Sequence, residues 1–105
     1  MPRLSSGTRY TRAVEFEWEP VKSERNLSRH GVAFTEAMTV FGDPLEVTIS
    51  DALHSEGESR FLSLGKSEAG RLLVVAYTER QGRIRIISAR EATPKERREY
   101  ESGTR

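Results

Sequence analysis

The stretch RLLVVAYTERQGRIRIISAR (Arg71–Arg90) decides the fold, because it reads as two strands joined by a short turn. The run Leu72–Tyr77 is continuously apolar, which predicts a central strand covered on both faces. After the turn ERQG, isoleucine and arginine alternate. Since side chains alternate between the faces of a strand, Ile84 and Ile86 should face the core and the interleaved arginines the opposite side.

The residues before this pair extend it into a meander. RFLSLG, at residues 60–65, reads as a strand, and the turn KSEAG links it to the central strand. LEVTIS, at residues 45–50, alternates as another strand, and a polar loop follows at residues 51–58. We therefore expect an antiparallel sheet built from hairpins.

The N-terminal part predicts a strand and a helix. VEFEW, at residues 14–18, alternates apolar and acidic residues as a half-buried strand does. Pro20 suits the first position of a helix that ends at His30, before Gly31. On that helix Lys22, Arg25 and Arg29 form one basic stripe, and Leu27 should point toward the core.

Two further helices are expected. Thr35 should cap a short helix that buries Ala37, Val40 and Phe41 and ends at Gly42.

Near the C-terminus, Thr93 and Glu96 have the spacing of a capping box, with Pro94 at the first helical position. That helix is highly charged, so it should dock through Tyr100.

These elements predict an α+β fold in which two N-terminal helices pack on a small antiparallel sheet, with a C-terminal helix. Residues 1–13 are rich in Ser, Thr, Gly and Arg and read as a flexible basic arm, and residues 14–105 as a single domain. The 105 residues contain no cysteine and no apolar run of transmembrane length, and the N-terminus lacks a secretory h-region. We expect a cytoplasmic protein without a cofactor.

Charge is unevenly distributed although the net charge is only +1. Residues 43–59 carry five acids and no Lys or Arg, whereas residues 81–98 carry six bases and two acids. A ligand responds to such local patches within a Debye length of about 10 Å. The basic segment is a candidate site for an anion, and ordinary solvated charge is the alternative.

Three blocks in order resemble the BrnT toxin family: FEWEPVKSERNLSRHGVAFTEAMTVFGDP, HSEGESRFLSLG and RIRIISAREATPKERREYE. The resemblance covers residues 16–101. It implies a RelE-like fold and an endoribonuclease that blocks translation. It also implies a BrnA-like antitoxin with a DNA-binding ribbon-helix-helix part, in a toxin–antitoxin heterotetramer that represses its own operon. Operator DNA would be contacted only through the antitoxin.

Metal-free RNA cleavage requires cations that stabilise the phosphorane, a base for the 2′-hydroxyl and an acid for the leaving oxygen. Arg60, Arg85 and Arg90 are the cation candidates, since a guanidinium grips two phosphate oxygens. Strict alternation puts Arg90 on the opposite face from Arg85, so it needs either a bulge or a position beyond the sheet edge to join the same site. A surface ion pair is the alternative role for each.

His54 is the candidate acid or base, because it lies in a polar loop with Glu56 and Glu58 nearby. His30 ends a helix, where a structural role is expected. Tyr100 is either an RNA contact or the docking anchor of its helix. The expected RNA-binding residues are Lys22, Arg25, Arg83, Lys95, Arg97 and Tyr100, and no metal ligands are expected.

Two other functions stay open from the sequence. The chain can be a non-enzymatic module that acts with an antitoxin as co-repressor. It can also be a metal-dependent enzyme that uses the acidic loop at residues 51–58.

Overall fold

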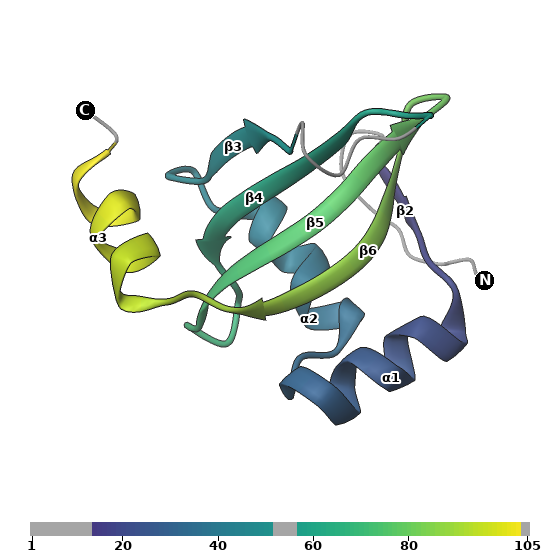
Figure 1. Cartoon of the computed structure of the whole chain (residues 1–105), viewed down its shortest axis with the longest axis horizontal. Helices are drawn as coiled ribbons and strands as arrows, with labels where there is room; N and C mark the ends of the chain where they lie inside the picture. Colours follow the sequence, from purple (N-terminus) through teal and green to yellow (C-terminus); the bar gives the residue numbers. More distant parts are fainter. Residues whose placement is uncertain (1–13, 52–56, 104–105) are drawn as a thin grey trace.

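The computed structural model describes residues 14–51 and 57–103 (Figure 1). Within these residues, a five-stranded sheet has the strand order β2-β6-β5-β4-β3. Helices α1 and α2 precede most of the sheet in sequence, and α3 follows it. The elements in chain order are β2 (Glu15–Glu17), α1 (Pro20–His30), α2 (Phe34–Met38), the 3-10 helix η1 (Thr39–Gly42), β3 (Val47–Ser50), β4 (Arg60–Lys66), β5 (Leu72–Arg80), β6 (Arg83–Glu91) and α3 (Pro94–Ser102).

The sheet is mixed, and the prediction of a purely antiparallel sheet is therefore wrong. Strands β3 to β6 pair antiparallel, but β2 pairs parallel to β6, with Phe16 opposite Ile84. A parallel pair needs a long connection, which the residues between β2 and β6 supply. Periodicity within a strand carries no information about its direction, so the sequence pattern missed this pairing.

The apolar core lies between one face of the sheet and the segment from Val32 to η1. Phe34 and Val40 are fully buried against Leu73 and Val75 of β5, with Ile86 and Ala89 of β6 in the same cluster. Residues Leu72–Tyr77 are all buried, which confirms the prediction that β5 is central and covered on both faces. We call the face that packs against α2 and η1 the covered face. The opposite face is called the open face as a label only, because its β5 side chains are buried as well.

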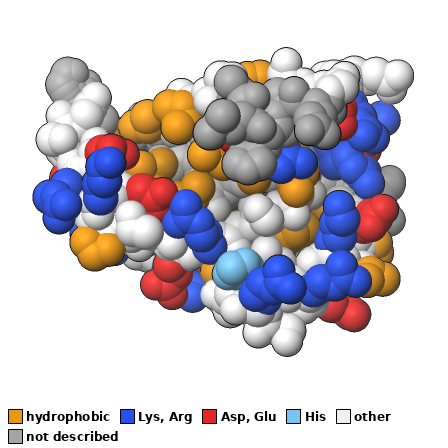
Figure 2. Space-filling model, viewed as in Figure 1, with side chains coloured by type: hydrophobic (Ala, Val, Ile, Leu, Met, Phe, Trp, Pro, Cys, Tyr) orange, Lys and Arg blue, Asp and Glu red, His pale blue; other side chains and the backbone are white. Residues whose placement is uncertain are grey.

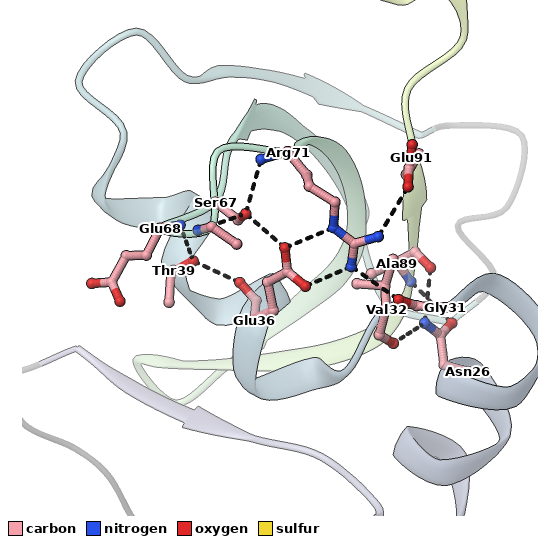
Figure 3. Close-up of polar contacts among 11 residues, drawn as sticks. Asn26, Gly31, Val32, Glu36, Thr39, Ser67, Glu68, Arg71, Ala89 and Glu91 are labelled. Carbon is pink, nitrogen blue, oxygen red and sulfur yellow. Dashed lines mark hydrogen bonds and ion pairs between the residues drawn. The ribbon is translucent and has the colours of Figure 1, made fainter.

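Helix α1 has the predicted bounds, but its inward side chain is Asn26. Leu27 is 51% exposed, so the prediction that it faces the core is wrong. The Nδ2 group of Asn26 donates to the carbonyls of Val32 and Ala89, each at 2.8 Å, and its Oδ1 accepts from the Ala89 amide at 3.1 Å (Figure 3). An amide that satisfies three backbone groups thus fastens α1 to β6.

Helix α2 begins two residues earlier than predicted. Its first residue is Phe34 and its N-cap is Ala33, which offers no side-chain cap, so the prediction that Thr35 caps the helix is wrong. Phe34 is fully buried. Burial of this ring therefore decides the start of the helix over capping preference.

Helix α3 has the predicted capping box and the predicted docking residue. The Thr93 hydroxyl accepts from the Glu96 amide, while the Glu96 carboxylate accepts from the Thr93 amide. The Tyr100 ring is buried, and its hydroxyl donates to Asp43 Oδ2 at 2.6 Å. Burial and, after it, the Asp43 carboxylate raise the pKa of Tyr100 to about 12. The ring is thus the docking anchor of α3.

On the covered side, Arg71 joins three parts of the chain. Its guanidinium donates to both carboxylate oxygens of Glu36, at 3.0 and 2.6 Å, to Glu91 at 2.9 Å and to the carbonyl of Gly31 at 2.9 Å (Figure 3). Hydrogen bonding to Glu36 raises the pKa of Arg71, and the same bond lowers the pKa of Glu36. Arg71 is therefore a structural residue.

Candidate functional site

One row of directly opposed residues crosses the open face of the sheet. Strand register pairs Glu17 with Arg85, Arg85 with Thr78 and Thr78 with Arg60, on β2, β6, β5 and β4. Residues directly opposite each other point to the same face. With strands about 4.8 Å apart, the Cα atoms of Arg60 and Arg85 are separated by about 10 Å, and Thr78 lies between them. We call these four residues the arginine row.

A carboxylate from the loop before β4 lies within reach of this row. Glu58 accepts two hydrogen bonds from Arg80, at 3.0 and 2.9 Å. The bond from Arg80 is the main cause that lowers the pKa of Glu58, and the charges of Arg85 and Arg60 lower it further. Three guanidinium groups therefore act on one exposed oxyanion at this end of the open face. A phosphate group offers the same chemistry.

On β2, Glu17 orients two arginines of β6. Its two carboxylate oxygens accept from Arg83 Nε at 3.1 Å and from Arg85 Nη1 at 3.2 Å. Arg85 also lies 3.8 Å from a carboxylate oxygen of Glu19. Partly exposed ion pairs of this kind contribute at most about 1 kcal/mol each. A stronger anion can therefore displace them at small energetic cost.

Thr78 has an unusual environment within the arginine row. The residue is 3% exposed, and its hydroxyl has no hydrogen-bond partner among residues 14–51 and 57–103. A buried hydroxyl without a partner destabilises a fold by about 1 to 3 kcal/mol. Asn26 on the covered side does not carry this cost, because its buried amide is hydrogen-bonded.

The structure contains the bulge that Arg90 needs to reach the open face. Tyr77 pairs with Ile86 and Ala76 with Ser88, which leaves Ile87 as the extra residue on β6. Beyond the bulge, the parity of β6 is reversed, so Arg90 and Arg85 lie on the same face. The bulge thus brings Arg90 to the open face.

Arg90 nevertheless lies apart from the arginine row. Its β5 partner is Val74 rather than Thr78, which places it about 13 Å farther along the strand. The guanidinium forms a two-pronged pair with Glu96 of α3, at 2.8 and 2.9 Å. This pair is the main cause that lowers the pKa of Glu96 to about 2. Arg60 and Arg85 are therefore brought together, and Arg90 is not.

Apart from Arg83 on β6, the other predicted site residues in the described ranges lie on two helices. Lys22 and Arg25 are exposed on α1, and Lys95 and Arg97 are exposed on α3. Figure 2 shows a run of Lys and Arg side chains over α1, beside the sheet. His54 lies outside the described residues. The Tyr100 ring is buried, whereas the neighbouring Lys and Arg side chains of α3 are exposed.

Sequence reasoning missed Glu17, Glu58, Thr78 and Arg80 as members of the site. The alternation in VEFEW put Glu17 on the polar face of its strand, but the partner strand was not identified. Thr78 and Arg80 ended an apolar run and gave no signal of their own. Their place opposite Arg60 and Arg83 depends on strand register, which the sequence pattern did not provide.

Two properties of the described residues bear on the class of protein. Within residues 14–51 and 57–103, no group of three or more His, Asp and Glu side chains is arranged to hold a metal ion. In the same residues, no helix is both long enough and apolar enough to span a membrane.

Comparison with known proteins gives one family and one fold. The family model described as "Ribonuclease toxin, BrnT, of type II toxin-antitoxin system" matches residues 18–96. Among solved structures, the chain is similar to the 1.1 Å crystal structure of the Brucella abortus ribonuclease toxin BrnT, with a TM-score of 0.60 and 15% identity. That match covers 77% of this chain and 99% of the Brucella chain, and at this identity it shows the fold alone. No curated protein matches the chain in sequence.

Proposed function

Because the chain belongs to the BrnT family of ribonuclease toxins of type II toxin–antitoxin systems, we propose that it is a metal-independent endoribonuclease that inhibits translation. One observation carries the placement of its site on the open face. Arg60 and Arg85 both lie opposite Thr78 on this face, and Arg80 holds Glu58 beside them with two hydrogen bonds. The lowered pKa of Glu58 agrees with three cations near one oxyanion. A scissile phosphodiester would take the place of this carboxylate.

In this proposal, the nucleophile is the 2′-hydroxyl of the substrate. Its oxygen attacks the adjacent phosphorus, the bond to the 5′-oxygen breaks, and a cyclic phosphate and a free 5′-hydroxyl result. Arg60 and Arg85 stabilise the charge that develops on the phosphorane, because guanidinium groups stay protonated throughout the useful pH range. Glu17 holds the Arg85 guanidinium in position before substrate binds.

Other residues complete the proposal. His54 is the candidate for the proton transfers, since its ordinary pKa lies near physiological pH. Arg90 is a further cation candidate and becomes available if Glu96 is released. Lys22, Arg25, Arg83, Lys95 and Arg97 are the candidates for contacts with the RNA backbone outside the scissile phosphate.

Membership of a type II toxin–antitoxin family implies an antitoxin partner. We propose that this partner is BrnA-like, with a ribbon-helix-helix part that contacts operator DNA, and that the two proteins form a heterotetramer in the cytoplasm. We also propose that the fold is RelE-like. The α+β architecture, with three α-helices and a five-stranded sheet among the described residues, supports it.

The test is RNA degradation by the purified full chain in buffer with EDTA. We expect cleavage products that carry cyclic phosphate ends, and growth arrest when the chain is expressed without its antitoxin. Cleavage that EDTA abolishes would favour the metal-dependent alternative. Intact RNA together with normal growth would favour the non-enzymatic co-repressor, for which the occupied guanidinium groups of Arg85 and Arg90 are the supporting observation.

A further inference from the structure

A second basic surface lies beside the sheet, on α1. Lys22, Arg25 and Arg29 are on one side of the helix and, with Asn26 and Ile87, line an open hollow with a volume of about 150 Å³. The Lys and Arg side chains over α1 are visible in Figure 2. We call this feature the α1 hollow.

The three cations of the α1 hollow lack carboxylate partners within residues 14–51 and 57–103. By contrast, five arginines that lie just before β5, on β5 or on β6 each donate to a Glu carboxylate. These are Arg71, Arg80, Arg83, Arg85 and Arg90. Like charges at spacings of three and four residues destabilise a helix by a few tenths of a kcal/mol. Their arrangement therefore opposes helix stability and favours an anionic ligand.

The geometry of β6 places the α1 hollow next to the arginine row. β2 pairs with β6 only from Arg83 to Arg85, and α1 lies beside the rest of β6 (Figure 1). Ile87, the bulge residue, lines the hollow and is two positions from Arg85, about 7 Å along the strand. The hydrogen bonds of Asn26 to Ala89 fix the helix at this edge. An RNA chain bound at the arginine row can therefore continue over this edge of the sheet onto α1.

We infer that the α1 hollow binds a backbone phosphate of single-stranded RNA at a position away from the cleaved bond. This inference rests on the proposed function and adds a second phosphate subsite to it. Arg25 and Arg29 supply guanidinium forks that match phosphate oxygens, and Lys22 adds a third cation. An acidic protein segment is a weaker match, because protein interfaces bury an apolar centre and Ile87 is the one aliphatic residue in the lining.

The experiment measures RNA binding separately from cleavage. The full chain carrying Arg60→Ala and Arg85→Ala is titrated against a labelled single-stranded RNA of about a dozen nucleotides, by fluorescence anisotropy at several salt concentrations. Addition of Arg25→Ala and Arg29→Ala should weaken binding about 10-fold or more. It should also make the dependence of log K on log salt shallower by about 0.7, the value for one phosphate contact on a single strand.

Arg98→Ala is the matched control, because Arg98 is equally exposed but lies on α3. It should leave affinity and salt dependence unchanged. Unchanged RNA affinity after loss of Arg25 and Arg29 would overturn the inference, as would loss of antitoxin binding with RNA binding intact. These outcomes are independent of catalysis. If the unsubstituted chain cleaves no RNA while RNA binding still depends on Arg25 and Arg29, the proposed nuclease is refuted and the subsite is supported.

Discussion

The two faces of the sheet treat their polar groups differently. On the covered side, Asn26 satisfies three backbone groups, and Arg71 donates to two carboxylates and a carbonyl. On the open face, Arg83 and Arg85 share Glu17, and the buried Thr78 hydroxyl has no partner in the part of the chain that the structure describes. The covered side is built to hold the fold together, whereas the open face keeps charges and a hydroxyl that folding does not need. A buried hydroxyl without a partner commonly marks a site of function.

The largest effect is expected at Asn26. Asn26→Asp keeps the shape of the side chain but replaces the donor to Val32 and Ala89 with an acceptor, and it buries a charge. We expect a loss of about 3 to 5 kcal/mol in the free energy of unfolding. Urea denaturation measures it.

Asn26→Ala provides the comparison, since it removes the amide without burying a charge. Its loss should be smaller, about 2 to 3 kcal/mol. If Asn26→Asp were as stable as the parent chain, the fastening of α1 to β6 through this amide would be wrong.

A smaller effect of opposite sign is expected at Thr78. Thr78→Val keeps the branched shape and removes a buried hydroxyl without a partner. We expect the free energy of unfolding to rise by about 1 kcal/mol. Ser63→Ala is the control, because the Ser63 hydroxyl is buried but bonded to Glu46 and Thr48, and its loss should destabilise. A drop in stability for Thr78→Val would mean that its hydroxyl is hydrogen-bonded in solution, and the two faces would then not differ in this respect.

Much of the fold follows from local patterns in the sequence. The apolar run of β5, the Pro20 start and Gly31 end of α1, and the Thr93–Glu96 capping box each lie within a few residues, and the structure confirms them. The parallel pairing of β2 with β6 and the inward position of Asn26 depend on contacts between distant residues. Periodicity cannot reveal such contacts.

The site was predicted less completely than the fold. Guanidinium chemistry predicts Arg60 and Arg85 as cations of the site, and they lie in one row because strand register places both opposite Thr78. Arg90 was recognised as needing a bulge, and the bulge exists, but the tie to Glu96 was missed. Tertiary geometry decides which arginine pairs with which glutamate. Composition alone therefore could not predict these ion pairs.

The most direct test of the account is a double-mutant cycle on RNA cleavage with Arg60→Ala, Arg85→Ala and the combined variant. Loss of a preorganised donor to a transition state typically slows cleavage about 100- to 1,000-fold. If both guanidinium groups act on the same phosphodiester, the combined variant should be little slower than either single variant. Losses that multiply, or single variants as active as Arg98→Ala, would contradict the claim that the arginine row grips one phosphate.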